Sequence, residues 1–494
     1  MHVPSALRQQ EYRMNPEKIW EIFDGICAIP RCSGSETAVA AYILDYARQN
    51  GCAARKDARG NVCVDVPASG GCENTPPLVI QTHLDMVCEK NAGVQHDFAA
   101  DPVKTETHGR WLCARGTTLG ADNGIGVACA LACIDAPHMP RPPLELLFTV
   151  EEETGLRGAA CSEPGFITGK RLLNLDSEEL GAVYVGCAGG SCTRVTFAPE
   201  WIRPPEAGET LDLAVSGLNG GHSGIDIHRK RGNAIVILAQ VLDALAGAVS
   251  FSVADISGGN KLNAIPREAR ARIVAGPREH DRIERIAAAC AADVRARLPD
   301  GNNGMVLSVN PVGGATPRVL DRNSRERLIR LLRDIPHGVL AVSRDIPGLV
   351  TTSNNLATAG IEGERLVVGT MARSSSLDDM RSVETAIAEV AGKCGAAAET
   401  GERYPGWEPD LGSPLLRLVM DAYEHVQGVR PEAKAIHAGL ECGILGERLP
   451  GLDMASIGPT IEGAHSPGER VDIESVAVFW DVLRAVLERS AARA

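Results

Sequence analysis

The chain has 494 residues, with 50 lysines and arginines against 63 acidic residues, which gives a formal net charge of −13. Nucleic-acid binding depends mainly on basic side chains that neutralise phosphates, so an acidic chain without a basic run argues against that function. A hydrophobic share of 44% is typical of a globular protein. A length of this size predicts about two to four domains.

The chain is expected to be cytoplasmic. Its first twenty residues lack the apolar centre of a secretory signal, and the longest apolar stretch, at residues 125–134, is too short to span a membrane. The 15 cysteines are odd in number and scattered from Cys27 to Cys442 without a CxxC spacing. This pattern favours free buried thiols over disulfides or cysteine-bound metal.

The first 190 residues predict helices that alternate with strands. A helix is expected to begin at Pro16 with Asn15 as N-cap, and Ser33 or Ser35 is expected to cap a second helix. The elements expected after these are strands at 61–66 and 78–81, an apolar helix at 124–134, and strands at 144–150 and 172–175. Apolar strands interleaved with helices predict an α/β domain with a sheet covered on both faces.

The pattern changes after about residue 190. We interpret residues 191–396 as a smaller inserted α+β domain, which interrupts a catalytic domain formed by residues 1–190 and 397–494. The insertion is expected to contain strands at 211–215 and 269–274, helices at 233–245 and 283–298, and a further strand and helix set over 328–390. The two sets suggest a weak internal repeat, although they share no motif. The Gly-rich stretch at 392–402 is expected to be the linker back to the catalytic domain.

Four polar clusters follow segments predicted as strands, at the sheet edge where α/β proteins bind ligands. They are His83 with Asp85, Asp122 among glycines, the triplet Glu151, Glu152 and Glu153, and Asp176. Taken singly, each has a commoner structural explanation as a core histidine, a solvated loop or a turn. Taken together, an imidazole and several carboxylates favour a divalent cation such as Zn²⁺, and two ions that share a carboxylate become plausible. A nearby free carboxylate would then act as general base.

Nine motifs in order resemble those of the aminoacyl-histidine dipeptidases (peptidase D, also called Xaa-His or cytosolic non-specific dipeptidases) of the M20 metallopeptidase family. They are QTHLDMV, LGADNGIG, TVEEETG, NLDSEE, GGHSGIDI, NKLNAIP, SNNLA, HAGLECG and GAHSPGERV. The resemblance implies a zinc-exopeptidase-like catalytic domain interrupted by a lid or dimerisation domain. It also implies a homodimer through that inserted domain and two divalent metal ions, with Zn²⁺ expected and Co²⁺ or Mn²⁺ as alternatives.

The resemblance further implies a role for single residues. The implied metal ligands are His83, Asp122, Asp176, Glu153 and His465, with Asp122 between both ions. Asp85 would orient His83, Glu152 would be the general base, and His222 would stabilise an oxyanion. The implied substrate contacts are Asn263, Arg373 for the terminal carboxylate and Glu441 for the free amino group; His437 and Cys442 are interpreted as structural. Glu151 stands where the family usually has Asp, and the spacing to Asp122 and Asp176 sets the register of the triplet.

The predicted function is hydrolysis of unblocked dipeptides, including Xaa-His dipeptides of the β-Ala-His type, by a water that two metal ions activate and Glu152 deprotonates. One alternative keeps the scaffold but changes the substrate, as in an M20-type aminoacylase, tripeptidase or carboxypeptidase that acts on N-acyl amino acids or longer peptides. A second alternative is a metal-binding homologue without catalysis. No nucleic-acid or membrane partner is expected.

Overall fold

The structure is a computed structural model that describes residues 16–136, 139–161, 163, 165–299, 304–314 and 316–492. The chain divides into two compact units. Unit 1 contains Met1–Gly186, Pro409–Ala435 and Leu440–Ala494, and unit 2 contains Cys187–Glu408 and Ile436–Gly439. Unit 2 thus takes one long insertion and one short segment near the end of the sequence. The first helix begins at Glu17 with Pro16 as its N-cap residue, so the prediction that Pro16 is its first helical residue is wrong; Asn15, the predicted N-cap, lies outside the described residues.

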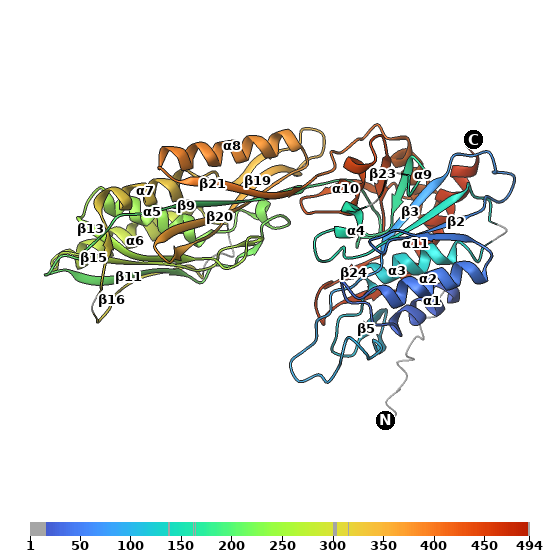
Figure 1. Cartoon of the computed structure of the whole chain (residues 1–494), viewed down its shortest axis with the longest axis horizontal. Coiled ribbons are helices and arrows are strands. Elements are labelled where there is room, and N and C mark those ends of the chain that lie inside the picture. Colours follow the sequence, from blue (N-terminus) through green and yellow to red (C-terminus); the bar gives the residue numbers. More distant parts are fainter. Residues whose placement is uncertain are drawn as a thin grey trace, which may run out of the picture. The chain divides into compact units, whose positions relative to one another are not determined.

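A mixed eight-stranded sheet forms the centre of unit 1 in its described part (Figure 1). β3 (Leu78–His83) runs parallel to β6 (Leu144–Thr149) and to β7 (Arg171–Asn174), and β7 runs parallel to β23 (Asp453–Ser456). Every residue of β3 and β6 is buried, so both faces of the sheet are covered, and the predicted α/β class is confirmed. The full order is β1 (Ala53–Lys56), β2 (Val62–Val66), β6, β3, β7, β23, β8 (Ala182–Cys187) and β22 (Glu432–Ile436).

The helices of unit 1 present apolar stripes to this sheet and to one another. α1 packs on α3, and α11 packs on α9. The bounds are α1 (Glu17–Cys27), α2 (Thr37–Gln49), α3 (Ala121–Ala132), α4 (Arg157–Ala160), α9 (Pro414–Gln427), α10 (Glu441–Arg448) and α11 (Ile473–Ala492). The predicted serine cap of α2 is wrong, because Glu36 is the N-cap residue and the hydroxyl of Ser33 instead donates to the carboxylate of Asp85 at 2.7 Å.

A second, small antiparallel sheet in unit 1 supports a turn that matters for the site. Its strands are β24 (Ile461–Glu462), β25 (Arg470–Asp472), β5 (Trp111–Ala114) and β4 (Thr105–His108), in that order. β24 and β25 are joined by the turn that contains His465 and Glu469.

Unit 2 is built from two sets with the same topology, which the sequence suggested as a repeat. The first set is β11 (Glu209–Ser216), α5 (Ala234–Ala246), β13 (Phe251–Gly258), β15 (Ala269–Ala275), α6 (His280–Arg297) and β16 (Val306–Pro311). The second is β9 (Gly189–Phe197), α7 (Arg322–Asp334), β19 (Val350–Glu362), β20 (Arg365–Ser374), α8 (Leu377–Lys393) and β21 (Ala397–Tyr404). In the sheet the sets read β16-β11-β15-β13 and β21-β9-β20-β19, and they meet where β13 pairs with β19.

Each set is therefore a βαββαβ unit with the same strand order, and the first is inserted between β9 and α7 of the second. The four helices lie in one layer, in which α5 contacts α6 and α7, and α7 contacts α8. Their apolar sides and the sheet enclose one hydrophobic core. The remaining short elements are β10 (Trp201–Ile202), β12 (Gly221–His222), η1 (Ile227–Arg229), β14 (Ala264–Ile265), β17 (Val319–Leu320) and β18 (Gly338–Val342).

Two further predictions from the sequence are wrong. The stretch 392–402, expected as a linker, ends α8 and forms most of β21, because its alanines and threonine pair with β9 instead of crossing between units. The cysteines are not all free thiols: Cys32 and Cys88 form a disulfide, with 5.7 Å between their Cα atoms. Spacing along the chain does not reveal this pair, since 56 residues separate the two positions. Among the described helices, none has the length and hydropathy that crossing a membrane requires.

Candidate metal centre and substrate residues

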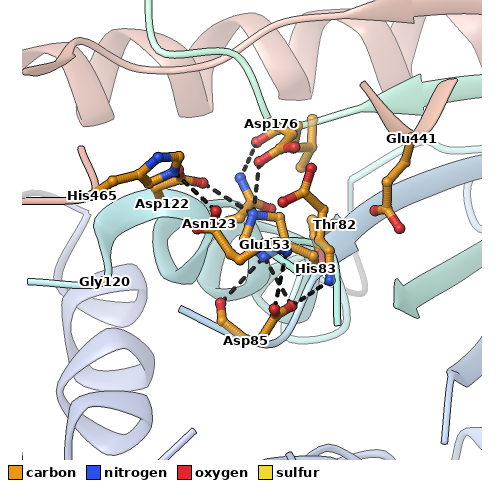
Figure 2. Close-up of polar contacts among 12 residues, drawn as sticks. Thr82, His83, Asp85, Gly120, Asp122, Asn123, Glu153, Asp176, Glu441 and His465 are labelled. Carbon is orange, nitrogen blue, oxygen red and sulfur yellow. Dashed lines mark hydrogen bonds and ion pairs between the residues drawn. The ribbon is translucent and has the colours of Figure 1, made fainter. Parts of the chain in front are cut away.

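Three of the implied metal ligands lie where strands of unit 1 end. His83 is the last residue of β3, Glu153 follows β6, and Asp176 follows β7. Because these three strands are parallel neighbours, their carboxyl ends meet at one edge of the sheet. Asp122 lies in the first turn of α3, where the backbone departs from helical geometry. Figure 2 shows these side chains converging with His465 from the β24–β25 turn.

The distances define two groups of potential ligands that share one carboxylate. Nε2 of His83 lies 3.0 Å from Oδ1 of Asp122 and 3.2 Å from Oδ1 of Asp176. Nε2 of His465 lies 3.2 Å from the other oxygen, Oδ2, of Asp122 and 2.9 Å from Oε2 of Glu153. In each group, one ligand atom from every residue lies within 4.8 Å of the others. The two oxygens of Asp122 therefore face two different histidines.

The chemistry of these groups suits divalent cations. The carboxylates of Asp176 and Asp122 raise the pKa of His83 against the effect of its complete burial, and hydrogen bonds to Asp122 and Glu153 raise the pKa of His465 to about 11. Burial raises the pKa of Asp176 to about 6. Within the described residues, the buried Oε1 of Glu153 has no hydrogen-bond partner. Carboxylates crowded in this way need positive charge, and His with carboxylate oxygens is the donor set that Zn²⁺ and its neighbours accept.

Asp85 connects the loop that follows His83 to the loop that contains Glu152 and Glu153. Nδ1 of His83 lies 3.2 Å from the backbone oxygen of Asp85 and 3.4 Å from its Oδ1, which leaves Nε2 free for a metal. The same carboxylate accepts hydrogen bonds from the backbone amides of Glu152 at 3.0 Å and Glu153 at 3.1 Å. Despite its burial, hydrogen bonds from His83, Ser33 and Glu152 lower the pKa of Asp85 to about 2. Asp85 therefore stays ionised while it holds both loops.

Glu152 and Glu441 are two further carboxyl groups near the ligands. Burial, together with the charges of Asp176, Glu441 and Glu153, raises the pKa of Glu152 well above its usual value. Burial also raises the pKa of Glu441 to about 8. One oxygen of Glu441, Oε2, accepts hydrogen bonds from Gln81 at 2.5 Å and from Thr149 at 2.6 Å. Its Oε1 is buried and, within the described residues, has no hydrogen-bond partner.

The other predicted residues, His222, Asn263 and Arg373, belong to unit 2. Nδ1 of His222 accepts backbone amides from Gly224 and Ile225 at 3.2 Å each, so the ring proton of the neutral imidazole is on Nε2. Burial and the charge of Arg373 lower the pKa of His222 to about 4. Nη2 of Arg373 lies 3.4 Å from Nε2 of His222. Two N–H donors thus lie side by side, which is an arrangement that binds an anion.

Several neighbours hold these donors in place. Arg373 is buried and donates through Nη1 to the hydroxyl of Tyr404 at 2.8 Å. Asn263 lies beside the His222 segment, because its backbone oxygen accepts the amide of Ser223 at 2.7 Å. Nδ2 of Asn355 donates to the carbonyls on both sides of Asn263, those of residues 262 and 264, at 3.2 and 2.8 Å. The motif SNNLA, which contains Asn355, therefore supports the loop of Asn263.

His437 and Cys442, interpreted from the sequence as structural, are both buried. Nε2 of His437 lies 2.7 Å from the hydroxyl of Ser353, and burial lowers the pKa of His437 to about 3.

Sequence reasoning did not assign several supporting residues. Ser33, Tyr404 and Asn355 have polar side chains whose partners are distant in sequence. The sequence also does not indicate the backbone conformation of Glu151 and His465, which have positive φ values of 52° and 63°. Such strained residues cluster at functional sites; Glu151 precedes the predicted base Glu152, and His465 is itself a predicted ligand.

The chain matches the model of peptidase family M20/M25/M40 over residues 79–489. It is 38% identical over 482 residues to the cytosol non-specific dipeptidase of Escherichia coli (strain K12), covering 97% of this chain and 99% of that protein. The chain belongs to the M20 family. The predicted family, and with it the class of metallopeptidase hydrolases, is confirmed.

Comparison with solved structures supports the same assignment. The aminoacylhistidine dipeptidase of Vibrio alginolyticus matches this M20 chain with a TM-score of 0.90 and 38% identity, over 97% of this chain and 98% of that one. An aminopeptidase from Bacillus cereus matches with a TM-score of 0.55 and 16% identity, over 97% and 100% of the two chains. At that identity the second match shows the fold alone.

Proposed function

We propose that this M20 chain is a metallo-dipeptidase that hydrolyses dipeptides with a free N-terminus, Xaa-His dipeptides among them. The observation that carries the proposal is the pair of ligand groups that share Asp122, next to the half-buried carboxyl group of Glu152. The names of the two 38% identical relatives, a non-specific dipeptidase and an aminoacylhistidine dipeptidase, support the substrate class.

His83, Asp122 and Asp176 would hold one metal ion, and Asp122, Glu153 and His465 the other. When bound, such ions polarise a carbonyl and lower the pKa of a water molecule. We propose Zn²⁺, with Co²⁺ and Mn²⁺ as alternatives that the same donors accept. By holding Nδ1 of His83, Asp85 would leave Nε2 available to a metal ion.

Glu152 is the proposed general base. It lies in the loop that Asp85 fixes through the backbone amide of Glu152 itself. The positive charge of bound ions favours its ionised form, so it can take a proton from the attacking water and pass it to the leaving amine. His222, with its proton on Nε2, would donate a hydrogen bond to the oxyanion of the tetrahedral intermediate.

Two charged groups would select an unblocked dipeptide. Arg373, with Nη1 held by Tyr404, would bind the terminal carboxylate, and Asn263 would contact the same part of the substrate. Glu441 has Oε2 occupied by Gln81 and Thr149, so its free Oε1 is the atom that would accept the substrate's ammonium group. An N-acyl group offers no such ammonium, which argues against the aminoacylase alternative.

A substrate panel tests the proposal. The protein, first stripped of metal and then reconstituted with Zn²⁺, Co²⁺ or Mn²⁺, is assayed with Xaa-His and other dipeptides, tripeptides and N-acetyl amino acids. We expect metal-dependent cleavage of the unblocked dipeptides. Preference for N-acetyl amino acids or for longer peptides would replace the dipeptidase proposal by the corresponding M20 alternative. Metal binding without hydrolysis of any compound would favour a non-catalytic homologue.

Three further predictions accompany the proposal. We propose a cytosolic location, which the name of the Escherichia coli relative supports. We also propose that the inserted domain acts as a lid or dimerisation domain and that the protein is a homodimer through it. Light scattering of the purified protein checks the oligomeric state, and a monomeric mass would contradict the dimer.

A further inference from the structure

The loop that carries Asp122 is held from two sides by buried residues of opposite charge, Arg31 and Glu469. Asp122 belongs to both ligand groups, so its position matters for both proposed ions. Arg31 is 2% exposed and Glu469 is 2% exposed, although both side chains are charged. Charged side chains are almost never buried to this extent unless they are paired and hydrogen-bonded.

Glu469 satisfies the amide groups of the loop. Its Oε2 accepts the backbone amides of Leu119 at 2.7 Å and Gly120 at 2.8 Å, and its Oε1 accepts that of Asp122 at 3.2 Å. A carboxylate has two oxygens with about four lone-pair sites, so it can accept all three bonds at once. An amide side chain cannot, because one of its two polar atoms is a donor.

Arg31 satisfies carbonyl groups of the same loop and of the His83 loop. Its Nη2 donates to the carbonyl of Gly120, and its Nη1 donates to the carbonyls of Leu84 and Asp85 at 2.9 Å each. Burial lowers the pKa of the Arg31 guanidinium, and the negative charges around it, those of Glu469, Asp85 and Asp122 among them, partly oppose that effect. One planar fork thus connects the loop that carries Asp122 to the loop that follows His83.

Two glycines of the LGADNGIG motif make room for this guanidinium. A Cβ atom on Gly120 would lie 2.4 Å from Nη2 of Arg31, and one on Gly124 would lie 2.8 Å from the same atom. Gly120 also has a φ of +73°, a conformation that other residues rarely adopt. The two glycines therefore allow Arg31 to approach the loop closely. Figure 2 shows this loop running from Gly120 to Asp122.

We infer that Arg31 and Glu469 are positioning residues of the metal centre, which set the place of Asp122 between the two ions. The inference rests on the proposed metal-dependent function. Both residues act through the position of Asp122 and not through contact with the substrate. Removing either hydrogen-bonding pattern should weaken the binding of both ions, because Asp122 is common to both groups of ligands.

The test measures metal binding, with Co²⁺ as the probe. Metal-stripped wild type, Glu469→Gln and the control Glu462→Gln are titrated with Co²⁺ against a competing chelator, and the visible d–d spectrum and the thermal unfolding of the metal-free proteins are recorded. Glu462 is an exposed glutamate on β24, in the same hairpin, that pairs with Arg470. We expect Glu469→Gln to bind both Co²⁺ ions about 10–100-fold more weakly and with an altered spectrum, and Glu462→Gln to match wild type.

Three outcomes decide the inference. Unchanged Co²⁺ affinity and spectrum in a folded Glu469→Gln would overturn it, even if the melting temperature fell, because Glu469 would then be merely structural. If Glu469→Gln does not fold, Arg31→Lys, which keeps the charge but loses the fork, must show the same weakening; unchanged affinity there overturns the inference. If the wild-type protein binds no Co²⁺, the proposed metal centre itself, on which the inference depends, is contradicted.

Discussion

The carboxylate of Asp85 accepts a hydrogen bond of 3.0 Å from the backbone amide of Glu152. The same carboxylate holds Nδ1 of His83, so a single side chain sets the position of a proposed metal ligand and of the proposed general base. Asp85 is fully buried, and the hydrogen bonds to its ionised form offset the cost of that burial.

We expect Asp85→Asn to lower kcat/KM by about 10–100-fold, because its amide nitrogen, itself a donor, would face the backbone N–H of either Glu152 or Glu153. Steady-state kinetics with the best dipeptide of the panel checks this. Asp481→Asn, at a position on α11 that is 56% exposed, is the control and should behave as wild type. Wild-type kinetics in Asp85→Asn would show that the link between the two loops is dispensable.

Glu152→Gln should lower kcat by at least about 10²–10⁴-fold, since it removes general acid–base catalysis without changing the size of the side chain. Metal content, measured by elemental analysis, should remain at the wild-type level because Glu152 is not among the proposed ligands. If turnover persists with a full complement of metal, another group must be the base.

His222 and Arg373 should respond differently to substitution. His222→Ala should lower kcat by about 10²–10³-fold with a smaller effect on KM, because an oxyanion donor acts mainly in the transition state. Arg373→Met should raise KM for dipeptides, because it removes the partner of the terminal carboxylate. Dipeptide amides, which lack that carboxylate, provide the matched substrate, and Arg373→Met should cleave them about as well as wild type does. An equal loss on amides and acids would contradict this role.

His437 should make stability depend on pH. Its pKa is lowered to about 3 in the folded chain by burial, whereas the unfolded chain titrates near the ordinary value of about 6.5. Between these values the unfolded state binds more protons, so the free energy of unfolding falls as pH falls, by about 2 kcal/mol at pH 5. Urea unfolding at pH 5 and 7.5 should show a smaller difference in His437→Asn than in wild type. His425→Asn, which changes an exposed histidine on α9, should keep the wild-type difference.

The disulfide between Cys32 and Cys88 should stabilise the chain. It closes a loop of 56 residues, for which chain entropy predicts up to about 4 kcal/mol. Wild type should lose free energy of unfolding when it is reduced, whereas Cys32→Ser should be insensitive to reductant. Cys161→Ser, which removes an exposed free thiol, should retain the wild-type response. Equal stability of oxidised and reduced wild type would mean that this cross-link contributes nothing.

The local pattern of apolar residues predicts the helices and strands in which apolar positions recur regularly. The predicted bounds agree with the structure to within a few residues for the strands at 78–81 and 144–150 and for the helix at 233–245. Burial of one or both sides of an element requires a clear pattern of apolar residues. The prediction of a linker at 392–402 is wrong, because alanine and glycine have little preference for strands and so do not indicate β21. Its pairing with β9, some 200 residues earlier, decides its structure.

The motifs alone identify the family and predict the residue types of the proposed site, since His83 and Asp176 follow strongly patterned strands and Asp122 precedes an apolar helix. Only the folded chain shows which atoms face one another: the two oxygens of Asp122 face two histidines, and the buried charges of Arg31 and Glu469 lie around the Asp122 loop. The reason is physical. Hydrogen bonds between residues that are tens to hundreds of positions apart depend on how strands and turns pack, and no local period records that packing.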